Sequence, residues 1–245
     1  MKVWKIALTI MALTALVAAS VVVAGDKMEA RNGAKMGEKK AEMSAEMGEQ
    51  MMAQVAIDKQ APNFTLMGVD GKEHSLADYK GKNVVLEWVN FDCPFVKKHY
   101  GSGNMPHLQK EYGSRDDVVW LSICSSAPGK QGYFTGQELK DRMKQSDWNA
   151  SNYLIDADGE VGRMYGAKTT PQMFVIDKEG VLRYAGAIDN IPSTRVEDIK
   201  DATNFVSSAL DNIKANKAVA TKTSTPYGCG VKYGEKSKAE ANKTL

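Results

Sequence analysis

The sequence predicts an α/β sandwich in which helices flank a central mixed β-sheet. Two apolar, β-branched runs, 84–89 and 116–123, have the length and composition of buried central strands. Segments with helical periodicity alternate with strand-like segments along the chain. The last two strands read as an antiparallel hairpin followed by a helix. Together these three observations favour a mixed sheet over an all-helical or all-β fold.

The first half of the domain is expected to open with a strand pair that turns at Asp70-Gly71, a dipeptide that favours tight turns. One helical turn over 75–79 then leads into the buried strand 84–89. A helix is expected over 94–112, and its "GSGN" segment should interrupt it. The apolar run 116–123 follows as the next buried strand.

The second half begins with a polar helix over 135–147, a strand over 152–156 and a short helix over 159–167. Strands over 172–177 and 181–187, joined by "KEG", form the hairpin. The last periodic signal places apolar residues at spacings of three and four on one helical stripe. These residues are Val196, Ile199, Phe205, Val206, Ala209, Leu210 and Ile213.

Composition narrows the function classes. The chain has 245 residues and 43% apolar content, enough for one domain with appendages. Its 32 basic and 30 acidic side chains nearly cancel. Bulk charge therefore gives no reason to expect nucleic acid or an anionic membrane as a partner.

The N-terminus, residues 1–25, is predicted to be a secretory signal peptide. Lys2 and Lys5 precede an uncharged stretch from Ile6 to Ala24, which ends in small residues suited to a peptidase. The alternative is an uncleaved anchor, because the stretch approaches the roughly 20 residues that span a bilayer. In both cases the rest of the chain is exported, to the periplasm or outside the cell, and only an anchor would hold it at a membrane.

Two segments flank the expected domain, 57–215. Residues 26–56 are rich in Met, Lys and Glu and are expected to be a linker. Met43, Met47 and Met51 would share a helix face, where their thioethers could bind cuprous ions. Residues 216–245 show no periodicity and are expected to form an extended, mobile tail that carries Cys229 between two glycines.

The cysteines are Cys93, Cys124 and Cys229. An odd number in an exported chain leaves at least one free, reactive or paired with another molecule. Cys93 stands where a buried strand ends and a helix begins, and a helix N-terminus lowers the pKa of a thiol. Lys97 and Lys98 would add to this effect if they face the sulfur, whereas Asp92 would oppose it.

These motifs resemble a known group. The strand into "DCPF", the later "KTTPQMFVID" and the closing hairpin and helix look like the thioredoxin fold, in its peroxiredoxin-like branch (redoxin, alkyl hydroperoxide reductase/thiol-specific antioxidant). The resemblance covers about 57–215. It implies that a threonine followed by a cis-proline faces the active cysteine, and Thr170-Pro171 match that pair. Both residues are then expected to shape the substrate groove.

The chain departs from the patterns of these relatives at four positions. Disulfide reductases carry a second cysteine three residues after the first, where this chain has Val96. Peroxidatic relatives carry Thr or Ser where Asn90 stands, Pro where Leu86 stands, and an Arg where Pro171 stands. Asn90 still offers a side-chain hydrogen bond to a peroxide. The simple C-x-x-C cycle is therefore absent, and the residue pattern of an efficient peroxidase is incomplete.

The resemblance implies an exported thiol-dependent oxidoreductase that reduces peroxides or disulfides, without a cofactor or metal. Cys93 would attack the substrate, and a second cysteine would resolve the product. Cys229 on its tail is the better candidate than Cys124, which ends a buried strand. A thiol/disulfide donor protein or a small thiol would return the electrons. The alternatives are a static Cys93–Cys229 disulfide and a redox-inactive or copper-handling binding protein.

Overall fold

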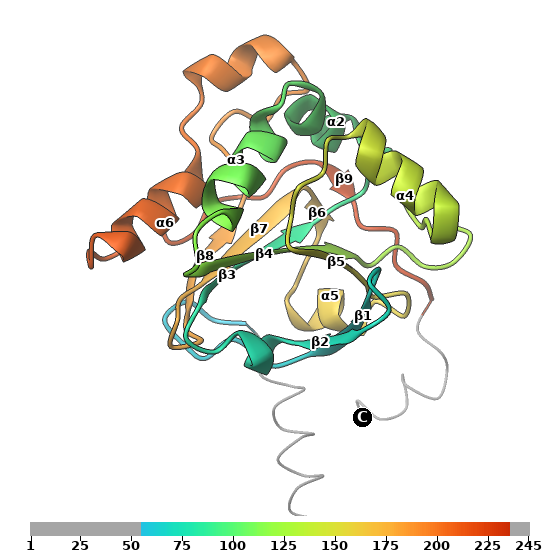
Figure 1. Cartoon of the computed structure of the whole chain (residues 1–245). Helices are drawn as coiled ribbons and strands as arrows, with labels where there is room; N and C mark the ends of the chain where they lie inside the picture. Colours follow the sequence, from blue (N-terminus) through green and yellow to red (C-terminus); the bar gives the residue numbers. More distant parts are fainter. Residues whose placement is uncertain (1–54, 236–245) are drawn as a thin grey trace, which may run out of the picture. The chain divides into compact units, whose positions relative to one another are not determined.

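The structure is a computed structural model that describes residues 55–235 (Figure 1). The predicted signal peptide or anchor, 1–25, lies outside the described residues. So does nearly all of the predicted linker, including Met43, Met47 and Met51. Within 55–235, no helix combines the length and apolar character needed to cross a membrane.

A seven-stranded mixed sheet forms the centre of the domain (Figure 1). Its strands are β1 (Thr65–Gly68), β2 (Glu73–Ser75), β3 (Asn83–Trp88), β4 (Val118–Cys124), β5 (Asn152–Ile155), β7 (Gln172–Ile176) and β8 (Leu182–Gly186). Their order is β2-β1-β5-β4-β3-β7-β8. β3, β4 and β5 are parallel, and the remaining neighbours are antiparallel. The predicted mixed sheet and the hairpin of β7 and β8 are confirmed.

The two central strands are buried on both faces because their side chains alternate between two cores. In β3 and β4, Val85 and Trp120 pair and lie in one core, and the next pair, Leu86 and Leu121, lies in the other. All residues of both strands are buried. This explains why their sequences are mostly apolar.

Helices cover both cores (Figure 1). They are η1 (Leu76–Tyr79), α2 (Pro94–Gly101), α3 (Asn104–Gly113), α4 (Gly136–Gln145), α5 (Glu160–Met164), η2 (Val196–Asp201) and α6 (Phe205–Lys214). α2, α3, α4 and α6 bury side chains in one core, and η1 and α5 bury theirs in the other. The predicted break within 94–112 is confirmed, since Gly103 caps α3 with a φ of 78°.

The single helical stripe expected over 196–213 is wrong. The chain instead forms the 3-10 helix η2, an extended residue Ala202, and then α6. The side chain of Asn204 accepts hydrogen bonds from the amides of Val206 and Ser207, which starts a new helix at that point. Val196 is 47% exposed and contributes nothing to the buried face of α6.

Residues 217–235, here called the arm, run back across the domain in extended form (Figure 1). Val219 is buried, and the Ser224 hydroxyl accepts a hydrogen bond from the Ala187 amide. Farther on, the Val231 amide donates to the Lys168 carbonyl, and the Tyr233 hydroxyl donates to the Ala167 carbonyl. These contacts hold the arm against the domain, which corrects the expectation of a mobile tail over 217–235.

Candidate active site

Cys93 lies at the junction of β3 and α2, as the N-cap of the helix. Its amide donates to the carbonyl of Asn90 over 2.9 Å, which closes a turn after the strand. Pro94 takes the first helical position, where its missing N–H costs no hydrogen bond. The side chain of Cys93 is fully buried, at 0% exposure. The sulfur therefore faces the protein interior and is covered by another segment of the chain.

That other part is a second, two-stranded sheet of β6 (Thr169–Thr170) and β9 (Cys229–Gly230). The Cys93 thiol donates to the Thr170 carbonyl over 3.1 Å. The Thr170-Pro171 peptide bond is cis. The structure thus brings Cys93 together with the two residues that the sequence placed opposite it.

Cys229 reaches the same place from the arm. β9 runs antiparallel to β6, and Cys229 stands directly opposite Thr170. The Thr170 hydroxyl donates to the Cys229 carbonyl over 3.5 Å. The Cys229 side chain is partly exposed, and its thiol lies within hydrogen-bonding reach of the Cys93 sulfur.

Gly228 lets the arm approach this closely. Its φ is 137°, in a region that favours glycine, and a Cβ added to it would lie 2.0 Å from the Thr170 carbonyl oxygen. Gly230, on the other side of Cys229, has room for a Cβ, whose nearest neighbour would be 3.9 Å away. The two glycines around Cys229 therefore play different parts.

The pKa of the Cys93 thiol is lowered from its ordinary value of 9.0. Burial raises the pKa, but hydrogen bonds from the side chains of Cys229 and Thr170 outweigh it. The amides of Val96, in the first turn of α2, and of Cys229 act in the same direction. The helix start thus contributes to thiolate formation as the sequence predicted.

The expected help from Lys97 and Lys98 is absent. The ammonium of Lys98 is buried and points at Asp189, 3.8 Å away, while exposed Lys97 lies 3.9 Å from Asp92. Neither lysine is among the groups that lower the pKa of Cys93. Asp92 also pairs with Arg142 on α4, so its charge is balanced by cations and does not oppose the thiolate as expected.

Cys229 is shifted the opposite way. Burial raises its pKa to about 11, and the neighbouring Cys93 adds to the increase. Two thiols in contact thus have different proton affinities, a pattern that separates nucleophile from proton-bearing partner. The lowered pKa favours the thiolate at Cys93, and the raised pKa favours the protonated thiol at Cys229.

Asn90 is engaged with the backbone. Its side-chain oxygen accepts from the Asp92 amide over 2.9 Å, and its side-chain nitrogen donates to the Gln131 carbonyl over 3.4 Å. These bonds shape the turn that delivers Cys93. The peroxide contact expected for Asn90 remains a prediction.

Cys124 lies at the end of β4 and is 2% exposed. Its thiol donates to the Gly132 carbonyl over 3.2 Å, and burial raises its pKa. Cys93 is also buried and also donates to a backbone carbonyl, but its pKa is shifted in the opposite direction. Of the two possible partners of Cys93, the structure brings Cys229 to its sulfur.

Sequence reasoning missed three residues near this site: Gly228, Tyr227 and Asp189. Tyr227 packs on Phe95 of α2, with 5.7 Å between ring centroids, and its hydroxyl donates to Asp189 over 2.5 Å. The available signal was the spacing in "YGCG", which puts a tyrosine two residues before the candidate resolving cysteine.

The opposite shifts of the two thiols predict the acid–base behaviour of the reduced protein. Followed by the ultraviolet absorbance of thiolates, one thiol should ionise below pH 9.0, and Cys229 should ionise near pH 11. Cys93→Ser should remove the lower step, because that step belongs to Cys93. A lower step that survives in Cys93→Ser would contradict this assignment.

Comparison with known proteins identifies the family. A family model described as Redoxin matches residues 56–204. The thiol-disulfide oxidoreductase ResA of Bacillus thuringiensis is 31% identical over 127 residues, which cover 52% of this chain and 67% of the relative. A thiol peroxidase of Streptococcus pneumoniae is 27% identical over 147 residues, covering 57% of this chain and 83% of the relative.

Solved structures support the fold. A hypothetical protein from Sinorhizobium meliloti superposes with a TM-score of 0.63 at 24% identity, covering 75% of this chain and 98% of that one. An uncharacterized conserved protein from Geobacillus kaustophilus gives 0.63 at 25% identity, covering 75% and 95%. With a mixed sheet flanked by helices, a cysteine at a helix start and a facing Thr-Pro pair, the chain belongs to the Redoxin family and has its thioredoxin-like fold.

Proposed function

We propose that this protein is an exported thiol-dependent oxidoreductase in which Cys93 attacks the substrate and Cys229 resolves the product. One observation carries the proposal: the arm places the Cys229 thiol beside the Cys93 sulfur, and the pKa values of the two thiols are shifted in opposite directions. The relatives named as a thiol-disulfide oxidoreductase and a thiol peroxidase support the reaction class.

The first step is attack by the Cys93 thiolate. With a disulfide RSSR, a bond forms between the Cys93 sulfur and one substrate sulfur, and RS⁻ leaves. With a peroxide ROOH, the sulfur takes the terminal oxygen to become a sulfenic acid, and ROH leaves after protonation. Because Cys93 is 0% exposed with the arm in place, the Cys229 segment must move aside for a substrate to enter.

The second step uses Cys229. Its thiolate attacks the Cys93 sulfur, forms the Cys93–Cys229 disulfide, and releases RSH or water. Once Cys93 has become a mixed disulfide or a sulfenic acid, its sulfur carries no charge. Its contribution to the raised pKa of Cys229 then disappears. The resolving thiol therefore becomes easier to ionise after the first step has occurred. Two external thiols then reduce the disulfide and become a disulfide themselves.

Disulfides are the better substrate class. No cationic side chain is among the groups that lower the pKa of Cys93, and the positions of the peroxidatic Thr/Ser and Arg hold Asn90 and Pro171. Thr170 and Pro171 would line the groove that the substrate occupies when Cys229 moves aside. Peroxide reduction would then be a slower, secondary activity.

The remaining assignments follow the same proposal. The predicted signal peptide supports export to the periplasm or beyond, with a thiol/disulfide donor protein or small thiol as reductant. The redoxin domain would extend over 57–215, with the 216–245 tail supplying Cys229. The copper-handling alternative depends on the Met-rich face, which lies outside the described residues, and no structural observation favours it.

The test is turnover of a model disulfide with excess dithiol donor, by wild type and by Cys229→Ser. Wild type should turn over many times. Cys229→Ser should show a burst of about one equivalent and then slow at least about tenfold, because its Cys93 mixed disulfide awaits an external thiol. Equal steady-state rates, at matched donor concentration, would overturn the resolving role. Hydrogen peroxide in place of the disulfide measures the secondary activity.

A further inference from the structure

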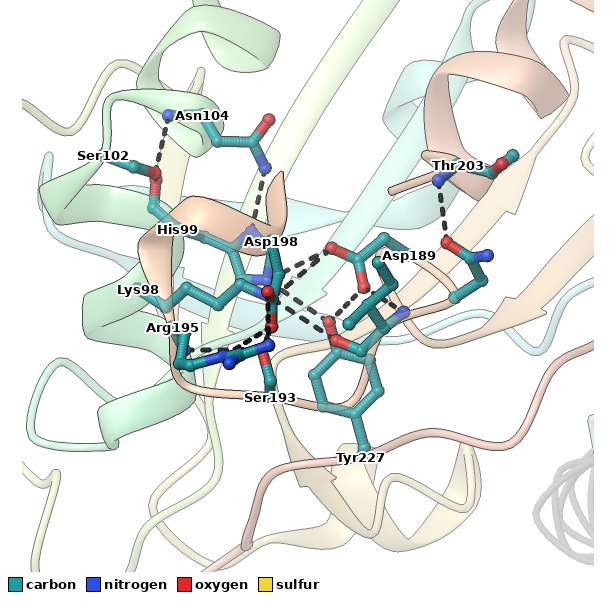
Figure 2. Close-up of polar contacts among 12 residues, drawn as sticks. Lys98, His99, Ser102, Asn104, Asp189, Ser193, Arg195, Asp198, Thr203 and Tyr227 are labelled. Atoms are coloured by element: carbon teal, nitrogen blue, oxygen red, sulfur yellow. Dashed lines mark hydrogen bonds and ion pairs between the residues drawn. The ribbon is translucent and has the colours of Figure 1, made fainter. Parts of the chain in front are cut away.

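A buried polar cluster lies between α2 and the arm (Figure 2). It consists of Lys98 and His99 from α2, Asp189 from the segment after β8, and Tyr227 from the arm, and is called here the Asp189 cluster. The side chains of Lys98 and His99 are 0% exposed and that of Asp189 is 3% exposed. None of these residues contacts the Cys93 sulfur among the recorded hydrogen bonds, and the steps above leave them unused.

A chain of hydrogen bonds leads from Asn104 through His99 and Tyr227 to Asp189 (Figure 2). The Asn104 side-chain nitrogen donates to Nδ1 of His99 over 2.8 Å, which leaves the ring proton on Nε2. Nε2 lies 3.4 Å from the Tyr227 hydroxyl oxygen, and that hydroxyl donates to Asp189 over 2.5 Å. Burial lowers the pKa of His99 to about 4, so the ring is neutral at neutral pH.

Several hydrogen bonds and charges hold the Asp189 carboxylate in place. One carboxylate oxygen accepts from the Ile191 amide over 3.0 Å as well as from Tyr227. The other oxygen lies 3.8 Å from both the Lys98 ammonium and His99 Nε2. A buried carboxylate is costly to leave without such partners. Tyr227 is the one of these partners that lies on the arm. Docking of the arm on the domain therefore completes the set of groups that stabilise the Asp189 carboxylate.

The position of Tyr227 ties this cluster to the active site. Only Gly228, where the chain bends, separates Tyr227 from Cys229. The Tyr227 ring packs on Phe95, two residues after Cys93 on α2. Gly228, between them, touches the Thr170 carbonyl region. With one residue between them, the position of Tyr227 constrains the position of Cys229.

We infer that Tyr227 is a positioning residue, whose hydrogen bond to the buried Asp189 holds Cys229 in place for attack on Cys93. The inference rests on the proposed resolving role of Cys229. Apolar packing alone would hold the arm against the domain but would allow it to slide along its length. A directional hydrogen bond to a fixed carboxylate also determines the position of Cys229 along the domain surface. The cluster would thus set the effective concentration of the Cys229 thiol at the Cys93 sulfur.

The test is Tyr227→Phe, which keeps the ring on Phe95 and removes only the hydroxyl. Closure of the Cys93–Cys229 disulfide, measured in a single turnover with a model disulfide, should slow about tenfold, while the first reaction of Cys93 should be no slower than in wild type. Tyr79→Phe is the matched control, because its hydroxyl also bonds a histidine, His74, over 2.6 Å, but its ring packs against the other core. Tyr79→Phe should form the Cys93–Cys229 disulfide at a rate within about twofold of that of wild type.

A second measurement separates this inference from the proposed function. In glutathione buffers, the equilibrium for forming the Cys93–Cys229 disulfide reports the effective concentration of Cys229 without requiring turnover. Tyr227→Phe should lower it about tenfold even if wild type proves inactive toward substrates. Closure and equilibrium within about twofold of wild type would overturn the positioning role, whatever the activity.

A double-mutant cycle then assigns the partner. Asp189→Asn keeps an acceptor oxygen but removes the charge that strengthens the bond to Tyr227. If Tyr227 acts through Asp189, the double variant should close no more slowly than the slower single variant. Fully multiplied effects would show that Tyr227 acts independently of Asp189 and would overturn that part of the inference.

Discussion

Turnover of a disulfide substrate is expected to fall to the uncatalysed background, at least about a hundredfold, when Cys93 is replaced by serine. A serine hydroxyl does not ionise near neutral pH and forms no disulfide, so neither the attack nor the resolution can take place. The fall should be equally complete with hydrogen peroxide. Stopped-flow measurement of substrate consumption, with a dithiol donor in excess, determines both rates.

Cys124→Ser is the matched control for this substitution. Cys124 is as buried as Cys93, but burial raises its pKa and its thiol donates only to the Gly132 carbonyl. A serine hydroxyl can make the same hydrogen bond, so the protein should fold and turn over within about twofold of wild type. If Cys93→Ser kept wild-type turnover while Cys124→Ser lost it, the nucleophile would have been assigned to the wrong cysteine.

Gly228→Ala is expected to displace the Cys229 segment of the arm from β6. A Cβ at this position would lie 2.0 Å from the Thr170 carbonyl oxygen, and the φ of 137° is strained for any residue with a side chain. Overpacking of this kind costs about 2 kcal/mol or more, which corresponds to about thirtyfold in the seated population. Closure of the disulfide should slow by a similar factor, while Cys93 should become more accessible to a thiol-alkylating probe.

Gly230→Ala controls for the loss of a glycine beside Cys229. Its added Cβ would come no closer than 3.9 Å to its nearest neighbour, the Lys168 carbonyl oxygen, so the arm should stay seated. Closure and alkylation of Cys93 should both stay within about twofold of wild type. Equal behaviour of the two alanine variants would show that close approach at Gly228 does not seat the arm.

Much of the fold could be predicted because local patterns determine it. The runs at β3 and β4 are mostly apolar because both faces of these strands are buried, and turns bound them in the sequence. The single helix expected over 196–213 was wrong because apolar residues recur every three or four positions through Ala202, where the backbone is extended. A capping asparagine at 204 was the local signal of the break.

The site was only partly predictable, for reasons of distance along the chain. The chemistry of Cys93 and the facing Thr170-Pro171 followed from local sequence and the family resemblance. The partners of charged groups did not, because a sequence does not show that Lys98 points at Asp189 or that Arg142 reaches Asp92. The seat of the arm depends on the pairing of β9 with β6 and on Tyr227 meeting Asp189, contacts between distant segments.

The redox pairing of Cys93 with Cys229 is tested most directly by a disulfide map after a single turnover. One equivalent of a model disulfide is added to the fully reduced protein, free thiols are blocked, and the peptides are identified by mass spectrometry. We expect a Cys93–Cys229 disulfide with Cys124 as a free thiol. A Cys93–Cys124 disulfide, or a lasting mixed disulfide on Cys93 with Cys229 still free, would contradict it.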